Sequence, residues 1–390
     1  MTNTKITVCI PVASQRGGAE LALMQLLQEG RDRSIDWDVI YFEDGTMVEA
    51  TRQLGIPVQV ILSGRLRNLP SYLRTVSKLK KHYKENKTDI AIGWMSMAHL
   101  YSGVAAYQCR IPAMWFQMGS SQRDNTIDRL TAAVPAKVTF VCGKLPGEAQ
   151  VQMNQKIPVK VIHLAVDLNK NNPDQLPSPV DMRAKLGIPG HATLIGMVSR
   201  LQRWKGVHTL LKAMPDVISQ YPDIHCVIVG GEHSREAEYT VYLKSLINEL
   251  NLASHVSMVG YQKNTEEWMQ AMDLVIHASD HEPFGMVIVE AMALGKPVIA
   301  GSKGGPSEII TDGVDGLLSE YDDHKMLAEN ICRILGDQEL AENLAVNARK
   351  RAQHFSTEKY AARLIESILQ YGRSSVKKLD EPLNTEATTK

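Results

Sequence analysis

Short runs of β-branched and apolar residues alternate with helix-like apolar patterns along most of this 390-residue chain. Parallel strands need a crossover connection, usually a helix, so this alternation predicts parallel sheets covered by helices. The predicted strands of the first half are residues 6–12, 39–42, 58–61, 90–94, 113–117, 138–142 and 159–162. The pattern then restarts, with predicted strands at residues 193–198, 225–229, 256–259, 274–277 and 297–300. The sequence therefore predicts an α/β protein with two doubly wound, Rossmann-like sheets.

A segment rich in Pro and Asn, residues 169–182, separates the two halves and has the composition of a linker. We expect a first domain over residues 1–168 and a second over 183–356. A terminal helix over 357–372 is expected to pack back on the first domain, and the polar residues 373–390 to form a disordered tail. Two such halves imply a central cleft, because ligands of parallel sheets bind at the carboxyl ends of the strands.

Charge is unevenly distributed, although the net charge of the whole chain is zero. Residues 1–172 carry 21 Lys/Arg against 14 Asp/Glu, and the remainder is acidic by the same margin. A basic half suggests an anionic partner such as a phosphate, a membrane surface or an acidic glycan. Solvated charge that segregated by chance explains the pattern about as well.

Cysteine usage and apolar stretches indicate the compartment. The five cysteines form no Cys-x-x-Cys pair, which argues against a zinc site or a disulfide framework and suits a reducing cytosol. The first residues lack the apolar region of a signal peptide, and no apolar stretch reaches the length of a membrane span. We therefore expect a cytoplasmic protein whose contact with a membrane, if any, is peripheral.

The string Glu-Pro-Phe-Gly-Met-Val-Ile-Val-Glu at residues 282–290 is the most informative about function. Its end carboxylates, Glu282 and Glu290, bracket a turn that opens an apolar helix. The first turn of a helix has free N–H groups and a positive dipole end, which suit a phosphate. Carboxylates on either side could accept hydrogen bonds from two sugars, as in a nucleotide-sugar. The alternative is an ordinary strand–helix–strand unit with solvated carboxylates; for the whole string we favour the ligand site.

Two further loops follow the first predicted strand of each half. Arg200 and Lys205 lie in a short loop at the edge of the second sheet, where two cations could stabilise a leaving diphosphate. Gly17 and Gly18 allow close backbone approach to a ligand in the first half. This glycine pair is not G-x-G-x-x-G and lacks a P-loop lysine, so nicotinamide and ATP fit poorly. Taken alone, the loop with Arg200 and Lys205 would be interpreted as solvated surface, and the glycine pair as a tight turn.

These motifs together resemble the retaining glycosyltransferases of the GT-B fold, specifically glycosyltransferase family 4. The resemblance covers about residues 5–370 and is most specific in the Glu-x7-Glu motif from Glu282 to Glu290. The Arg-Leu-x-x-x-Lys-Gly motif begins at Arg200, and the segments 305–310 and 312–318 are similar to downstream segments of the family.

The resemblance implies specific roles for these residues. Glu290 would bind the donor ribose, Glu282 the donor sugar, and Arg200 with Lys205 the diphosphate. Gly17 and Gly18 would close on the diphosphate, Tyr261 would lie near the base, and a stretch of backbone would face the sugar hydroxyls and the phosphate. That stretch comprises Phe284, Gly285, Met286 and Val287.

The chain departs from the family where many members have a His that contacts the donor sugar. Gln117 and Met118 stand there, and neither His99 nor His163 matches the position. Asp36-Trp37-Asp38 fits the Asp-x-Asp metal pattern of another glycosyltransferase fold, but it lies away from the expected site. We interpret it as charge at a strand edge and predict neither a catalytic metal nor a cofactor.

Residues 65–87 combine eight Lys or Arg residues with an apolar stripe at helical spacing, and Glu85 is their only acid. A basic amphipathic helix can rest on an anionic membrane. A helix that faces the core of its own domain and solvates its basic side fits slightly better, because such stripes usually bury in the parent domain.

The predicted reaction is transfer of a sugar, with retention, from a nucleotide-diphosphate sugar to a saccharide or a lipid-linked saccharide. Retention is implied by the resemblance. Nothing indicates a nucleic-acid partner. A nucleotide-sugar epimerase shares this architecture, but the Glu282–Glu290 string and the Arg200–Lys205 loop count against it. A non-catalytic scaffold that binds a nucleotide-sugar or a glycan is the alternative that the missing His motivates.

Overall fold

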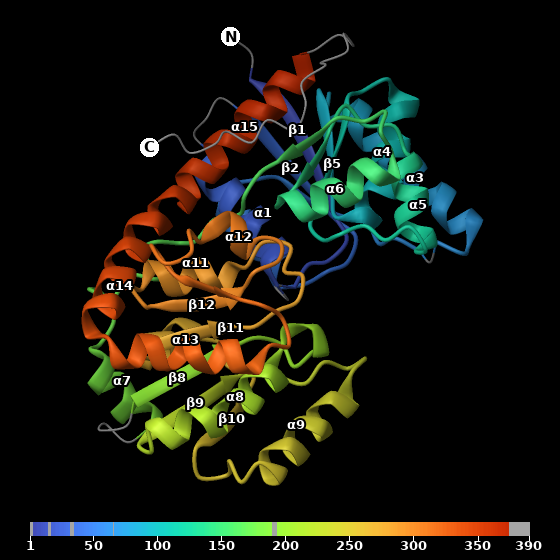
Figure 1. The fold of residues 1–390 in the computed structure, drawn as a ribbon. Helices are drawn as coiled ribbons and strands as arrows, with labels where there is room; N and C mark the ends of the chain where they lie inside the picture. Colours follow the sequence, from blue (N-terminus) through green and yellow to red (C-terminus); the bar gives the residue numbers. More distant parts are fainter. Residues whose placement is uncertain (1–2, 15–16, 32–34, 65, 189–192, 374–390) are drawn as a thin grey trace. The chain divides into compact units, whose positions relative to one another are not determined.

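The computed structural model describes residues 3–14, 17–31, 35–64, 66–188 and 193–373 of the chain. By their internal contacts they form two compact units, each containing one parallel sheet flanked by helices (Figure 1). The first unit comprises Met1–Leu164 and Thr357–Lys390, and the second comprises Ala165–Ser356. The predicted fold class, two doubly wound parallel sheets, is confirmed.

The sheet of the first unit has the order β3-β2-β1-β4-β5-β6-β7, and all its pairings are parallel. Its strands are β1 (Thr4–Ile10), β2 (Ile35–Tyr41), β3 (Val58–Val60), β4 (Ile90–Trp94), β5 (Ala113–Gln117), β6 (Thr139–Val141) and β7 (Val159–Val161). Each corresponds to a predicted strand. However, β2 begins four residues before the predicted start at residue 39, because Asp36 and Asp38 interrupt the apolar run on which the prediction relied.

Helices from both ends of the chain cover the first sheet. They are α1 (Gly18–Gly30), α2 (Thr46–Gln53), α3 (Leu69–Glu85), α4 (Ser96–Cys109), α5 (Thr126–Ala133), α6 (Lys144–Met153) and α15 (Thr357–Arg373). The last of these packs on α1, where the Thr357 hydroxyl donates to the Glu29 carboxylate over 3.0 Å and Ile365 approaches Gly30. Arg373, expected in the tail, is the final residue of α15; the rest of the predicted tail lies outside the described residues.

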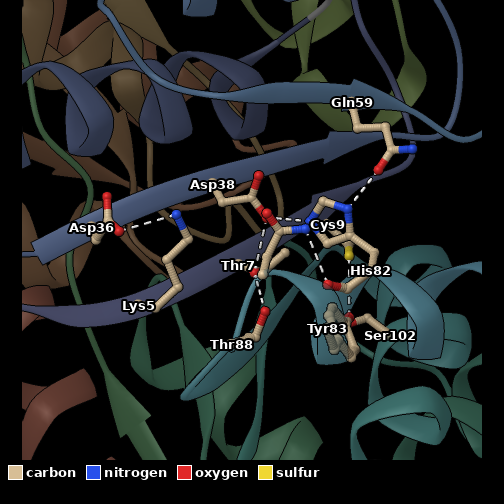
Figure 2. A network of polar contacts seen from close by, with 11 residues as sticks. Lys5, Thr7, Cys9, Asp36, Asp38, Gln59, His82, Tyr83, Thr88 and Ser102 are labelled. Atoms are coloured by element: carbon tan, nitrogen blue, oxygen red, sulfur yellow. Dashed lines mark hydrogen bonds and ion pairs between the residues drawn. The ribbon is translucent and has the colours of Figure 1, made fainter.

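The two acids of the Asp-x-Asp pattern differ in environment, as Figure 2 shows. Asp36 is exposed and pairs with Lys5 over 3.1 Å, as expected for strand-edge charge. For Asp38 that interpretation is wrong, because the side chain is buried and contacts His82 Nε2 at 2.5 Å. Thr7 also donates to Asp38, and the other ring nitrogen of His82 contacts Gln59, so this network fastens α3 to the sheet.

Helix α3 is the basic helix predicted from residues 65–87, and it faces the core as the favoured interpretation expected. Val76, Leu79 and Tyr83 are buried in the hydrophobic core of the first unit. At the N-terminal end, Leu69 and Leu73 remain 62% and 54% exposed, beside exposed basic residues. The apolar stripe is therefore divided between a buried part and a solvent-facing part.

Substituting Asp38 by alanine should destabilise the protein by roughly 1–3 kcal/mol, because the buried side chains of Thr7 and His82 lose the hydrogen-bond partner that they share. Asp36→Ala on the same strand is the matched control, and it removes only a surface pair worth about 1 kcal/mol or less. Urea unfolding of both variants measures the difference. Equal midpoints for the two variants would show that the buried network contributes nothing.

The sheet of the second unit has the order β10-β9-β8-β11-β12-β13 and is also parallel throughout. Its strands are β8 (Thr193–Val198), β9 (Ile224–Val229), β10 (Val256–Gly260), β11 (Leu274–His277), β12 (Val298–Gly301) and β13 (Leu317–Ser319). The sequence did not predict β13, since Leu-Leu-Ser is too short and too poor in β-branched residues to read as a strand.

The helices of the second unit are α7 (Pro179–Leu186), η1 (Arg203–Lys205), α8 (Val207–Gln220), α9 (Ala237–Glu249), α10 (Thr265–Ala271), α11 (Met286–Ala293), α12 (Pro306–Ile309), α13 (His324–Gly336), α14 (Gln338–Ala352) and η2 (Gln353–Phe355). One apolar core joins α8, α9 and α13 to the sheet. Helix α7 begins inside the predicted linker, because the Ser178 hydroxyl accepts from Asp181 N–H and Pro179 suits the first helical turn.

Candidate functional site

The strand order of the second sheet locates a ligand-binding edge. The chain passes from β8 to β9 on one side, whereas β11 lies on the other side of β8 and leads to β12. The loops that follow β8 and β11 therefore diverge at a topological switch point, where parallel α/β sheets bind ligands. These loops, residues 199–206 and 278–285, contain five of the eleven site residues singled out from the sequence: Arg200, Lys205, Glu282, Phe284 and Gly285.

The backbones of the two loops are in direct contact. Asp280 N–H donates to the Trp204 carbonyl over 2.9 Å. Gly206 has φ +77°, and a Cβ there would lie 1.9 Å from the Ala278 carbonyl oxygen, so only glycine fits. Gly285, with φ +111°, turns the second loop into α11. This close approach brings the side chains of the two loops together.

Lys205 and Glu282, predicted to bind different parts of the donor, form a buried ion pair between Nζ and Oε2. The Lys205 ammonium also lies 4.1 Å from the centre of the Trp204 ring. Arg200 is exposed, and its charge contributes to lowering the pKa of Lys205. Two cations and a carboxylate thus converge at the switch point, as the sequence predicted, but the lysine and the carboxylate hold each other.

The electrostatics of the pair favour its charged form. Burial opposes ionisation of Glu282, but the Lys205 ammonium and the His277 N–H outweigh it and hold the pKa of Glu282 well below its usual range. Burial also lowers the pKa of Lys205, against the attraction of the carboxylate. Removing either partner would leave a buried charge without compensation.

His277 and Ser279 complete this cluster, and sequence reasoning missed both. His277 is the last residue of β11, and its Nε2 lies 2.9 Å from Glu282 Oε2 and 2.8 Å from Ser279 Oγ. Both side chains are buried, and burial lowers the pKa of His277. A histidine at the carboxyl end of a predicted strand, next to the switch point, was the signal that could have revealed it.

Helix α9 and the residue before it hold the Arg200–Lys205 loop from outside. The Glu236 carboxylate accepts from the Arg203 backbone N–H and from the Gln202 side chain, each over 2.9 Å. The Arg203 guanidinium lies 5.3 Å and 5.1 Å from the ring centres of Tyr239 and Tyr242. The loop is therefore fixed at its backbone, and the Lys205 side chain projects from an ordered support.

Glu290 lies one turn into α11, apart from the Lys205–Glu282 pair. Burial raises the pKa of Glu290 to about 7, while the neighbouring Lys170 lowers it and Glu266 raises it further. Lys170 and Glu266 pair with each other over 3.1 Å. Among the described residues none donates a hydrogen bond to the Glu290 carboxylate, so both of its oxygens can accept from a ligand.

The remaining residues predicted in the second unit differ in exposure. Tyr261 follows β10, is 77% exposed and lies against Gly231, at the same edge of the sheet. Phe284 is buried against Phe355 and therefore offers a ligand only its backbone, as predicted. Met286 and Val287 form the first turn of α11 and are partly exposed.

In the first unit, Gly17 and Gly18 stand at the start of α1, and Arg16 beside them lies outside the described residues. Gln117, one of the two residues that stand where the resemblance implies a His, is buried; its amide oxygen accepts from Ser96 and its amide nitrogen donates to Ser121. His99 is buried and stacked on Trp115, and burial lowers its pKa to about 4. His99 therefore has the features of a neutral core histidine.

Two features are absent from the part of the chain that the structure describes. Each helix is too short or too polar to span a bilayer. Within the same ranges, no group of three or more His, Cys, Asp or Glu side chains could hold a metal ion.

Comparison with known proteins shows similarity to glycosyltransferases. Residues 180–351 match the sequence model of the family described as "Glycosyl transferases group 1". The chain is 34% identical over 217 residues to a D-inositol 3-phosphate glycosyltransferase of Corynebacterium urealyticum, covering 55% of this chain and 51% of that protein. It is 31% identical over 163 residues to the lipopolysaccharide core biosynthesis glycosyltransferase LpsE of Rhizobium meliloti, covering 42% and 45%. The matches thus span about half the length of these curated relatives.

A solved structure matches nearly the whole chain. Anabaena HepE, crystallised with UDP and glucose, superimposes with a TM-score of 0.80 at 27% identity, over 94% of this chain and 100% of HepE. The fold described above, with two parallel sheets and a switch point between β8 and β11, agrees with these similarities. The chain therefore has the GT-B fold, and its second unit is similar in sequence to glycosyltransferases.

Proposed function

We propose that this protein is a retaining glycosyltransferase of family 4 that transfers a sugar from a nucleotide-diphosphate sugar to a saccharide or a lipid-linked saccharide in glycan biosynthesis. The observation that supports this most directly is the convergence of Arg200, Lys205 and Glu282 at the switch point, beside the first turn of α11. HepE, which binds UDP and UDP-glucose, has the same fold and supports a donor of this class.

In the proposed mechanism, the bond between the anomeric carbon and the diphosphate oxygen breaks while the acceptor oxygen attacks from the same face. The acceptor's proton passes to an oxygen of the departing diphosphate. Negative charge grows on the leaving group, so Arg200, Lys205 and the N–H groups at the start of α11 stabilise the transition state more than the ground state. Glu282 orients the sugar, and Glu290 accepts from the ribose hydroxyls.

The experiment that tests the proposal is a donor screen with the intact protein, using UDP-, GDP- and ADP-sugars. A donor at a hundred times its dissociation constant should stabilise the fold by about 2.7 kcal/mol, measured as a thermal shift. With the donor found, NMR of the product should show retention at the anomeric carbon. EDTA should leave the rate unchanged, because the mechanism needs no metal. A protein that binds none of these donors would refute the proposal.

A non-catalytic scaffold is the second candidate, and Gln117 favours it, since its amide is already bonded to Ser96 and Ser121 where many relatives have a His. A donor-hydrolysis assay separates the two functions. An enzyme releases nucleoside diphosphate slowly from the donor even without an acceptor, whereas a scaffold binds the donor and never cleaves it. In both cases, a donor sugar that keeps its configuration during the assay argues against an epimerase.

We also propose peripheral contact with an anionic membrane through the exposed end of α3, at the cytoplasmic face. Leu69 and Leu73, one turn apart, stand in solvent beside Arg74 and Lys78, and such a surface suits the headgroup region of a bilayer. A lipid-linked acceptor would then be within reach of an enzyme that has no membrane-spanning helix of its own among the described residues.

Replacing Arg74, Lys78 and Lys81 together by glutamine should weaken binding to anionic vesicles about a hundredfold at low salt. Each basic residue near such a surface contributes about 1 kcal/mol. Sedimentation with phosphatidylserine-containing vesicles measures it. The matched control replaces the exposed Lys244, Lys325 and Lys350, and it should sediment like the parent. If both triple variants bind equally, α3 is an ordinary surface helix.

A further inference from the structure

Among the described residues, every hydrogen bond to the Glu282 carboxylate is made to the same one of its two oxygens. Lys205 Nζ, His277 Nε2 at 2.9 Å and Ser279 Oγ at 3.4 Å all contact Oε2. Within the described ranges, no group donates a hydrogen bond to Oε1. A carboxylate held in this way cannot rotate freely, and its second oxygen remains available to accept a hydrogen bond from a ligand.

The imidazole of His277 can hold the carboxylate in only one tautomer. Glu282 is ionised and therefore only accepts, so the contact requires a proton on His277 Nε2. Nδ1 is buried and has no hydrogen-bond partner in the part of the chain that the structure describes, which is consistent with a neutral ring protonated at Nε2 alone. His277 is 1% exposed and is the last residue of β11, so its ring is positioned by the sheet rather than by a flexible loop.

We infer that His277 is a positioning residue for the donor sugar: with Ser279 it fixes Glu282 Oε2, so that Oε1 is presented to a sugar hydroxyl. This inference rests on the proposed function. Within the site, Lys205 supplies positive charge, and His277 fixes the orientation of the Glu282 carboxylate. Lys205 uses one N–H on Glu282 and keeps its others for the diphosphate.

The affinity for UDP and the affinity added by the sugar should respond differently to a change at His277. In the proposed arrangement the nucleotide and the diphosphate do not touch His277, so a change there should leave the affinity for UDP intact. Only the added affinity that comes from the sugar depends on the orientation of Glu282. Turnover depends on it too, because misplacing a reacting sugar lowers the rate more than it weakens binding.

The test compares His277→Leu, which keeps the bulk of the ring without an N–H, with His277→Gln, which keeps an N–H donor near the position of Nε2. Titration calorimetry gives the affinities for UDP and for UDP-glucose, and steady-state kinetics gives kcat and KM. His225→Leu is the matched control. His225 lies in the same sheet, and its hydrogen bond of 2.9 Å to Ser257 is outside the cluster around Glu282.

For His277→Leu we expect unchanged UDP affinity, UDP-glucose affinity reduced about tenfold, and kcat reduced about tenfold or more. The glutamine variant should recover most of both losses, and His225→Leu should behave like the parent. Equal losses for UDP and UDP-glucose, or no recovery with glutamine, would overturn the positioning role. A parent protein that binds neither ligand would instead refute the choice of donor on which the inference rests.

A measurement on the unaltered protein covers the case in which the leucine variant does not fold. Nitrogen-15 NMR of the imidazole should show His277 neutral and protonated at Nε2 at pH 7. In Glu282→Gln the Nε2 resonance should move, because its acceptor changes from a carboxylate to an amide. A ring protonated at Nδ1, or a resonance indifferent to Glu282, would overturn the inference without reference to any ligand.

Discussion

Replacing Lys205 by methionine should lower the rate of sugar transfer by about 10²–10³-fold, while the affinity for the donor falls much less. Methionine keeps much of the length of the side chain but removes the charge that stabilises the departing diphosphate. Steady-state kinetics separates kcat from KM. A variant in which only KM rises would show that Lys205 binds the ground state and has no part in the departure of the leaving group.

Lost stability is the main competing explanation for such a loss, because the substitution leaves the buried Glu282 without its cation. The double variant Lys205→Met, Glu282→Gln removes both charges and should regain most of the thermal stability but none of the activity. Arg200→Ala provides a second comparison. Its side chain is exposed, so its charge is better screened and its effect on kcat should be smaller in the same direction.

Glu290→Gln should stabilise the fold at alkaline pH and weaken nucleotide binding at the same time. The pKa of Glu290 is raised from 4.5 to about 7, so its stabilising contribution is full below pH 4.5 and is lost as the pH rises through 7. At pH 8 the glutamine variant should be more stable than the parent by roughly 2 kcal/mol, allowing for the partial exposure of the residue. At pH 5 the two proteins should be nearly equal.

The Glu290→Gln variant should bind nucleotide more weakly although its fold is more stable, since a glutamine cannot accept hydrogen bonds from two ribose hydroxyls as a carboxylate can. We expect about tenfold to hundredfold weaker binding of nucleoside diphosphate at pH 8. Thermal unfolding across the pH range and direct titration give the two quantities separately. A variant that gains stability without losing affinity would remove Glu290 from the ribose site but leave its pKa explained by burial.

Most of the fold could be predicted from the sequence, because the strands of parallel sheets are buried on both faces and form continuous apolar runs. The prediction failed where a polar residue is buried or where a strand is very short. The start of β2 was missed because Asp38 is buried beside His82, a partner 44 residues away that no local pattern reveals. Strand β13 was missed because three residues with one serine give too little periodicity, and its pairing with β12 alone defines it.

The site residues were predicted from the sequence, whereas the ion pair between Lys205 and Glu282 was not. Lys205 and Glu282 are 77 residues apart, and only the order of β8 and β11 in the sheet makes them partners. The contact between His277 and Glu282 was not predicted, because the sequence does not show how the short loop between them turns. The roles that the resemblance implies for Gly17 and Gly18 require both units and stay predictions.

The return of α15 to the first unit has a consequence for the order in which the chain can fold during synthesis. The face of α1 that Ile365 covers has no partner until the ribosome has made the whole of Ala165–Ser356. Domains usually fold from the N-terminus as they emerge. Here the second unit can fold while the first is still missing a helix, so a nascent chain stalled between the two would expose an apolar surface to chaperones.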